Sequence, residues 1–79
     1  MDIISLLQEA MESNTESLFE AKDGVLIHIT PDDAQSLAVI HDALNLNNQR
    51  VMRSLMEESG KNFFNVLTFC YKHTTEEEH

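Results

Sequence analysis

One segment near the start of the chain, LFEAKDGVLIHIT at residues 18–30, limits the possible folds more than any other. Val25–Thr30 predicts a β-strand, because it is rich in β-branched residues and places Val25, Ile27 and Ile29 on one side, which belongs in a core. A single strand leaves backbone N–H and C=O groups unpaired, so it needs a partner strand. The fold therefore depends on whether that partner comes from the same chain or from a second copy.

The residues before this strand allow a hairpin. If residues 18–21 form a strand, Asp23 and Gly24 are the pair that a two-residue type I′ turn prefers. In that register Leu18 faces Ile29. Glycine suits the turn because it tolerates a positive φ.

The same residues also allow a helix. If residues 14–22 are helical, Gly24 supplies the left-handed residue that commonly ends a helix. The strand at residues 25–30 then stands alone and has to pair across a twofold axis. Both interpretations remain open at this point.

Local signals in the first half of the chain predict two helices. Residues 2–12 carry apolar residues at helical spacing on one side, namely Ile3, Leu6, Leu7, Ala10 and Met11. Thr30 can cap a second helix, with Pro31 in its first turn and two acids, Asp32 and Asp33, at the positive end of the helix dipole. The buried stripe predicted for this second helix consists of Leu37, Ile40 and Leu44.

The second half predicts two more helices. Asn47 or Asn48 can cap a third helix that Gly60 ends, and its apolar side consists of Val51, Met52, Leu55 and Met56, with both methionines expected in the core. Residues 61–73 predict a last helix whose apolar arc covers about 220° of its circumference. The arc consists of Phe63, Phe64, Val66, Leu67, Phe69, Cys70 and Tyr71. Because one core contact needs less, we expect some of these aromatic residues to face another helix or another chain.

These elements predict a mostly helical α+β fold: an N-terminal helix, one strand or hairpin near residues 18–30, then two or three helices. With 79 residues the chain forms a single domain, which we place at residues 1–75, followed by an acidic disordered tail at residues 76–79. A domain of this size buries only about 60% of its unfolded surface. We therefore also expect a homodimer.

Charge is distributed unevenly along the chain, which has a formal net charge of −9. Residues 1–42 hold nine acids against Lys22 alone, for −8, whereas residues 43–75 carry +2. One interpretation is a solvated acidic surface, and the other is an acidic face for a basic partner protein.

The chain has features of a soluble cytoplasmic protein. Its single cysteine, Cys70, indicates a reducing compartment. The acidic N-terminus lacks the positive charge of a signal peptide, and no apolar run reaches membrane-spanning length, so no membrane insertion is expected.

No group of residues predicts chemistry. Cys70 and His73 lie three residues apart, with His28 and His41 elsewhere, but structural zinc sites usually present two such close pairs. No oxyanion donor or glycine-rich loop accompanies the cysteine. The sequence therefore predicts a buried structural thiol, no catalytic residue, no metal or other cofactor, and no enzymatic activity.

Residues 24–58 resemble the layout of the ribbon-helix-helix repressors. The segment ITPDDAQSLAVIHDALNLNNQRVMRSLM is similar in spacing to the strand end, first helix, turn and second helix of that family. The resemblance implies an intertwined dimer, in which the strand pairs with its copy, and a DNA-binding transcriptional repressor.

The same resemblance implies which residues would meet DNA. Family members read DNA from the outer face of the strand, where this chain has Leu26, His28 and Thr30. None of them carries a fixed positive charge, and Lys and Arg supply much of the affinity for nucleic acid. Arg50 and Arg53 remain candidates for a phosphate contact. A nucleic-acid partner is therefore the alternative hypothesis.

The leading hypothesis is a small acidic adaptor, inhibitor or regulator that binds another protein. An acidic half and a surplus of aromatic residues suit a partner with a basic rim and an apolar groove. Aromatic residues tend to carry interface energy. The residues expected to contact the partner are Phe63, Phe64, Phe69 and Tyr71 on the last helix, with Leu26 and His28 on the outer face of the strand. His28 is also a candidate pH-sensitive contact, because histidine changes charge near neutrality.

Overall fold

Local sequence signals place most of the helices and strands. The structure, a computed structural model, describes residues 2–76, and this part of the chain contains four helices and one antiparallel hairpin. In chain order the elements are α1 (Ile3–Ser13), β1 (Ser17–Glu20), β2 (Leu26–Ile29), α2 (Pro31–Ala43), α3 (Leu46–Glu58) and α4 (Gly60–Glu76). The predicted mostly helical α+β fold, with an N-terminal helix, a hairpin and three further helices, is confirmed.

Of the predicted acidic tail at residues 76–79, the structure describes only the first residue. Glu76 is the last residue of α4. Residues 77–79 lie outside the described residues, so the disordered tail stays a prediction.

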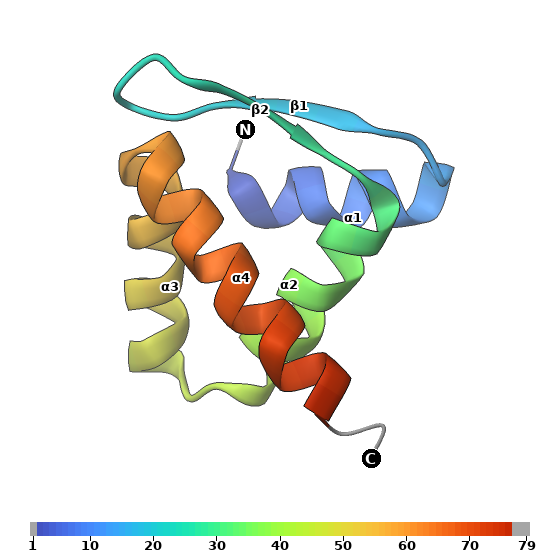
Figure 1. Cartoon of the computed structure of the whole chain (residues 1–79), viewed down its shortest axis with the longest axis vertical. Coiled ribbons are helices and arrows are strands. Elements are labelled where there is room, and N and C mark those ends of the chain that lie inside the picture. Colours follow the sequence, from blue (N-terminus) through green and yellow to red (C-terminus); the bar gives the residue numbers. More distant parts are fainter. Residues whose placement is uncertain (1, 77–79) are drawn as a thin grey trace.

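The elements form two packed groups. Helix α1 lies under the hairpin and packs against β1 and α2 (Figure 1). Helices α3 and α4 pack against each other, are joined by Ser59 alone and diverge from that junction (Figure 1). The tip of the hairpin reaches over the junction, while α2 packs against α1 on one side and α4 on the other.

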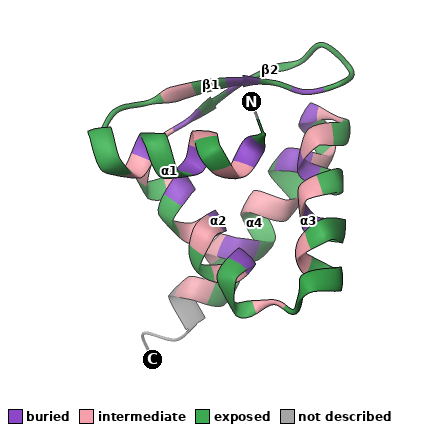
Figure 2. Ribbon diagram, turned by 180° about the vertical axis from the view of Figure 1, so that it is seen from behind, coloured by how far each residue is buried: buried purple, intermediate pink, exposed green. Residues whose placement is uncertain are grey.

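All of the elements contribute to one hydrophobic core, shown in purple in Figure 2. The buried hydrophobic residues are Ile3, Leu7, Ala10, Phe19, Ala21, Ile27, Ile29, Ala34, Leu37, Met52, Met56, Phe63 and Cys70. The prediction that Met52 and Met56 lie in the core is confirmed. Ile40 and Leu44, predicted to belong to the buried stripe of α2, are only half-buried at its edge.

The hairpin forms within one chain. β1 and β2 pair antiparallel, and Leu18 lies opposite His28. A helix over residues 14–22 and a lone strand that pairs with a second copy are therefore wrong, because β2 finds its partner strand in β1. Asn14, in the left-handed conformation with φ of 54°, ends α1 before the hairpin begins.

The predicted register of the hairpin is wrong by one residue. Residues 22–24 form a three-residue loop instead of the expected two-residue turn, with Gly24 in the left-handed conformation at φ of 86°. A left-handed third residue is typical of such loops. The observed register pairs Phe19 with Ile27, so that both side chains reach the core. In the predicted register Phe19 would lie opposite His28 and share its solvent-facing side.

The hairpin loop is hydrogen-bonded to the junction of α3 and α4. The N–H of Lys22 donates to the carbonyl of Glu57 at 2.9 Å, near the end of α3 where carbonyls lack partners within the helix. The carboxylate of Asp23 accepts the N–H of Gly60 at 3.3 Å and the N–H of Val25 at 3.1 Å. The loop therefore satisfies backbone groups at the end of one helix and at the start of the next.

Gly60 has a different role from the one predicted. It does not end α3, which stops at Glu58, but is the first residue of α4. A Cβ atom on Gly60 would lie 2.5 Å from Cγ1 and 2.9 Å from Cβ of Val25. Glycine is needed here because the hairpin approaches the helix closely.

Two helix caps show one confirmed prediction and one correction. Thr30 caps α2 as predicted: its hydroxyl accepts the N–H of Asp33, whose carboxylate accepts the N–H of Thr30. Asn45 caps α3, not Asn47 or Asn48, because the helix starts directly after it. The side-chain oxygen of Asn45 accepts the N–H of Asn48 at 2.9 Å.

The contact between Gly60 and Val25 can be measured by a mutant cycle. Gly60→Ala should lower the free energy of unfolding by about 1–3 kcal/mol, because the added methyl group overpacks against Val25. In a Val25→Gly background the same change should be neutral or stabilising, because alanine is favoured over glycine in helices by up to about 1 kcal/mol. Denaturant unfolding of the four proteins measures both values. An equal cost in the two backgrounds would contradict the contact.

Candidate functional site

An apolar hollow lies between α3 and α4, bordered by the end of α2. We call it the α3–α4 groove, and its volume is about 340 Å³. Its lining residues are Ile40, Leu44, Asn48, Val51, Met52, Leu55, Asn65, Val66, Phe69 and Cys70. The two asparagines are the polar members of this set, so the walls are almost entirely hydrocarbon.

Three of the lining side chains remain about half exposed to solvent. Val51 and Leu55 on α3 are 51% and 43% exposed, and Phe69 on α4 is 53% exposed. Met52 and Cys70, in contrast, belong to the core. The groove is thus a continuation of the core that no other described element covers.

A second hollow extends the groove along α3. It has a volume of about 380 Å³ and is lined by Arg50, Val51, Ser54, Leu55, Glu58 and Asn62. Val51 and Leu55 line both hollows. The concave surface therefore runs along α3 and passes from apolar to mixed polar walls.

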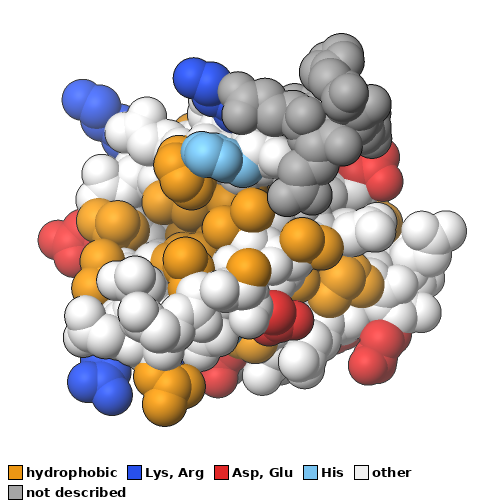
Figure 3. All heavy atoms as spheres, turned by 90° about the horizontal axis from the view of Figure 1, so that it is seen from below, with side chains coloured by type: hydrophobic (Ala, Val, Ile, Leu, Met, Phe, Trp, Pro, Cys, Tyr) orange, Lys and Arg blue, Asp and Glu red, His pale blue; other side chains and the backbone are white. Residues whose placement is uncertain are grey.

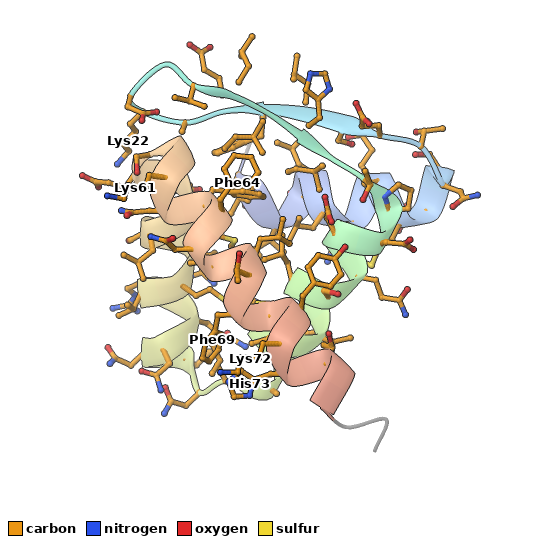
Figure 4. The ribbon with its side chains drawn as sticks, in the orientation of Figure 1. Lys22, Lys61, Phe64, Phe69, Lys72 and His73 are labelled. Atoms are coloured by element: carbon orange, nitrogen blue, oxygen red, sulfur yellow. The ribbon has the colours of Figure 1, made fainter. Side chains whose placement is uncertain are left out.

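Figure 3 shows this end of the molecule from below. Hydrophobic side chains gather into a patch, and Lys and Arg side chains project at its margin (Figure 3). His73 stacks against Phe69 within the patch, with ring centroids 4.2 Å apart and planes inclined at 45°. Figure 4 shows the two rings close together near the lower end of α4.

A buried histidine fixes α3 relative to the end of α2. Arg53 approaches Nε2 of His41 at 3.1 Å, and because arginine only donates, Nε2 must be the acceptor. The proton of the neutral ring then lies on Nδ1, 3.5 Å from Asp42. Gln49 donates to the carbonyl of His41 at 2.9 Å. These bonds hold the helices that border the groove in one arrangement.

The four aromatic residues predicted to contact a partner lie in different surroundings. Phe63 is fully buried in the core, and Tyr71 is half-buried with its hydroxyl donating to Asp33. Phe64 and Phe69 are exposed by 52% and 53%, but they lie at different places along α4 (Figure 4). Phe64 lies towards the hairpin, and only Phe69 lines the groove.

The other two predicted contact residues lie on the outer face of the hairpin. Leu26 is 58% exposed and faces solvent with His28. Nδ1 of His28 lies 2.5 Å from the Glu16 carboxylate in an exposed pair, and exposed pairs of this kind contribute little to stability. The six predicted residues therefore do not form one surface.

The sequence does not identify Val51 and Leu55 as residues that lie at the surface. The sequence predicts both on the apolar side of the third helix, together with Met52 and Met56. The four residues span about 140° of the helix, an ordinary width for the apolar stripe of a core-facing helix. The sequence pattern therefore gives no sign that two of them face outward, and the structure shows that Val51 and Leu55 do.

Cys70 is a buried thiol next to the groove. Its side chain has no exposed surface, and burial raises its pKa to about 11. A thiol with a raised pKa is a poor nucleophile at neutral pH, because the thiolate is the reactive form. Among residues 2–74, whose side chains the structure describes, no group of three or more His, Cys, Asp or Glu is placed to hold a metal ion.

A helix that crosses a bilayer has to be both long and apolar. Within the described range of residues 2–76, none is both long and apolar enough to cross a bilayer.

The comparisons with known proteins add no relative. No protein-family model, no curated protein and no solved structure matches the chain.

Tyr71 provides a direct test of the packing of α4 on α2. Burial, the hydrogen bond to Asp33 and the negative charges of Asp33 and Asp32 raise the pKa of Tyr71 to about 12. The chain has one Tyr and no Trp, so ultraviolet absorbance of tyrosinate reports this residue alone. We expect a titration midpoint near pH 12 in the folded protein and near pH 10.0 in denaturant.

The same titration has a consequence for stability. As the pH rises the unfolded state loses the Tyr71 proton first, so the contribution of this group is complete below pH 10 and is lost between pH 10 and about 12. Asp33→Asn should lower the folded-state midpoint more than the matched change Asp32→Asn does. A folded-state midpoint near pH 10 would contradict the contact.

Proposed function

We propose that this chain is a small acidic cytoplasmic protein that acts by binding another protein, as an adaptor, inhibitor or regulator, and that has no enzymatic activity. The single cysteine supports the reducing compartment. The proposed contact surface is the α3–α4 groove.

One observation carries this proposal: Val51, Leu55 and Phe69 form adjoining, half-exposed walls of an apolar groove between two helices. Single exposed hydrophobic residues are common on protein surfaces, but a contiguous concave apolar patch marks an interaction site. Grooves between helices bind the apolar face of an amphipathic partner helix. A protein ligand therefore fits the shape and the chemistry of the surface.

The lining of the groove supports a binding role without catalysis. Cys70 is the ionisable side chain among the lining residues, and its pKa of about 11 keeps it protonated at neutral pH. The polar lining residues, Asn48 and Asn65, neither gain nor lose a proton near neutrality. Neither asparagine can serve as a general acid or base.

Most of the acidic charge and most of the groove lie on different elements, and α2, which lines the groove through Ile40, is the element that contributes to both. The −8 of residues 1–42 falls on α1, the hairpin and α2, whereas residues 43–75, which include α3 and most of α4, carry +2. We assign the acidic part to solubility and the groove to recognition, because net charge keeps small proteins dispersed.

The alternative of a DNA-binding repressor gains no support from a specific observation. The outer face of β2 presents Leu26 and His28, and β2 itself pairs with β1. A homodimer stays a prediction, and the hairpin has removed one reason for it, because β2 needs no strand from a second copy.

Phe64 and Phe69 provide a matched pair of variants. They are the same residue type on the same helix with nearly equal exposure, 52% and 53%, but only Phe69 lines the groove. Phe69→Ala should weaken binding of the partner about tenfold or more, as expected for an aromatic anchor, and Phe64→Ala should leave it unchanged. The measurement is affinity capture from a lysate of the source with the unchanged protein, followed by titration of the captured protein against both variants.

The two variants also define the contradicting results. If the two variants bind the partner with equal affinity, the contact lies outside the groove. The same conclusion follows if Phe64→Ala alone loses binding. Circular dichroism of each variant shows whether the fold is retained.

A further inference from the structure

We propose that the exposed face of α3 pairs with the same face of a second copy, antiparallel around a twofold axis near Ser54, and that this homodimer covers the α3–α4 groove. The second copy then occupies the groove in place of the partner, so self-association and partner binding exclude each other. Only this competition rests on the proposed function, because the pairing concerns the chain alone.

One continuous face of α3 is open to solvent. The five residues of α3 that line the second hollow are all exposed, namely Arg50, Val51, Ser54, Leu55 and Glu58. We call them the α3 face. At 3.6 residues per turn they fall within about 140° of the helix. Val51 and Leu55 are also walls of the α3–α4 groove, so a helix that lies on the α3 face covers part of both hollows.

The two charges on the α3 face have opposite signs and lie at its two ends. Arg50 precedes Ser54 by four residues, and Glu58 follows it by four. Eight residues along a helix separate the two charged residues by about 12 Å, too far for an ion pair within α3. Within the described part of the chain, neither side chain takes part in an ion pair or a hydrogen bond.

Antiparallel pairing makes the α3 face complementary to itself. A twofold axis at Ser54 brings Arg50 of each copy level with Glu58 of the other, so that two pairs of opposite charge form. Parallel pairing would instead place like charges against each other. The small side chain of Ser54 at the axis lets the two helices approach closely. Val51 and Leu55 of both copies then bury the half of their surface that is exposed.

The charges around the α3 face favour neither an acidic nor a basic partner. Asp42 is exposed at the end of α2, and Lys72 is exposed near the lower end of α4 (Figure 4). Lys61, at the hairpin end of α4, lines neither hollow. The arrangement of charges along α3 therefore selects the occupant, and this arrangement fits a second copy.

The size of the contact indicates a weak dimer. Stable interfaces engage about 20–30 residues on each side, more than the α3 face and the walls of the groove provide together. We therefore expect monomer and dimer to interconvert, with a dissociation constant on the order of 100 μM. A dimer this weak gives up the groove to a partner that binds more tightly.

A charge-swap experiment tests the pairing. Sedimentation of the protein alone, from about 10 μM to about 1 mM, should show a monomer that converts to a dimer. Arg50→Glu and Glu58→Arg each turn both attractive pairs into repulsive ones, so either variant alone should dimerise about tenfold more weakly. An equimolar mixture of the two variants should dimerise like the unchanged protein, because one chain then supplies two acids and the other two cations.

A matched variant controls for net charge. Glu12→Arg makes the same change of charge as Glu58→Arg, and Glu12 is exposed near the end of α1 that points away from α3 (Figure 1). This variant should dimerise like the unchanged protein. Circular dichroism shows whether each variant retains the fold.

The captured partner tests whether the dimer covers the groove. Adding the partner to the dimer should give complexes that contain one copy of each protein, because the two occupants exclude each other. A complex with two copies of each protein would overturn the proposed covering of the groove.

Three results would overturn the pairing itself. They are a protein that stays monomeric up to about 1 mM, single variants that dimerise as strongly as the unchanged protein, and a mixture of the variants that dimerises no better than either alone. The proposed function would survive each of them, because the matched pair Phe64→Ala and Phe69→Ala measures partner binding separately. Conversely, a dimer that follows the charge swaps would stand even if Phe69→Ala left partner binding unchanged.

Discussion

The close contact between Gly60 and Val25 is the constraint on which the arrangement of the second half depends. Because Gly60 has no side chain, the hairpin can lie directly on the start of α4. The loop then bonds the end of α3 through Lys22 and the start of α4 through Asp23. A single residue, Ser59, separates the two helices, so this contact holds the point from which they diverge.

The groove is a consequence of that divergence. Helices joined at one end and splayed at the other leave apolar residues without partners on their facing sides, as Val51, Leu55 and Phe69 are here. His41 fills part of the space where α2 ends, and its hydrogen bonds to Arg53 and Gln49 of α3 fix the border of the groove. The binding surface proposed for this protein is therefore built by packing at some distance from it, in the hairpin and at the end of α2.

Local chemistry made much of the fold predictable. The hydroxyl of Thr30 and the ring of Pro31 favour a helix start, which the structure confirms. The alternation at residues 25–30 predicts a strand, which the structure places at Leu26–Ile29, with Val25 outside it and 41% exposed. Gly24 and Gly60 show the limit of such signals. The sequence allows Gly24 either a hairpin turn or a helix end, both with a positive φ, and predicts that Gly60 ends a helix; Gly24 is left-handed in the hairpin loop, whereas Gly60 starts α4 and leaves room for Val25. Only tertiary contact separates these roles.

The candidate site was less predictable for a related reason. The wide apolar arc of the last helix correctly indicated surplus hydrophobic surface, but an arc does not tell which flank meets the core. Phe63 turned inward, Phe64 lies towards the hairpin and Phe69 faces the groove. The partners of Phe69, Val51 and Leu55, come from another helix, and a pattern within one helix carries no information about them.

Amide hydrogen exchange at Lys22 tests the central constraint most directly. The N–H of Lys22 lies in an exposed loop of the hairpin, and its bond to Glu57 exists only if that loop rests on the junction of α3 and α4. The structure predicts exchange at least about 100-fold slower than in an unstructured peptide. Exchange at the rate of an open loop would show that the hairpin does not hold the junction, and the account of the groove would fail with it.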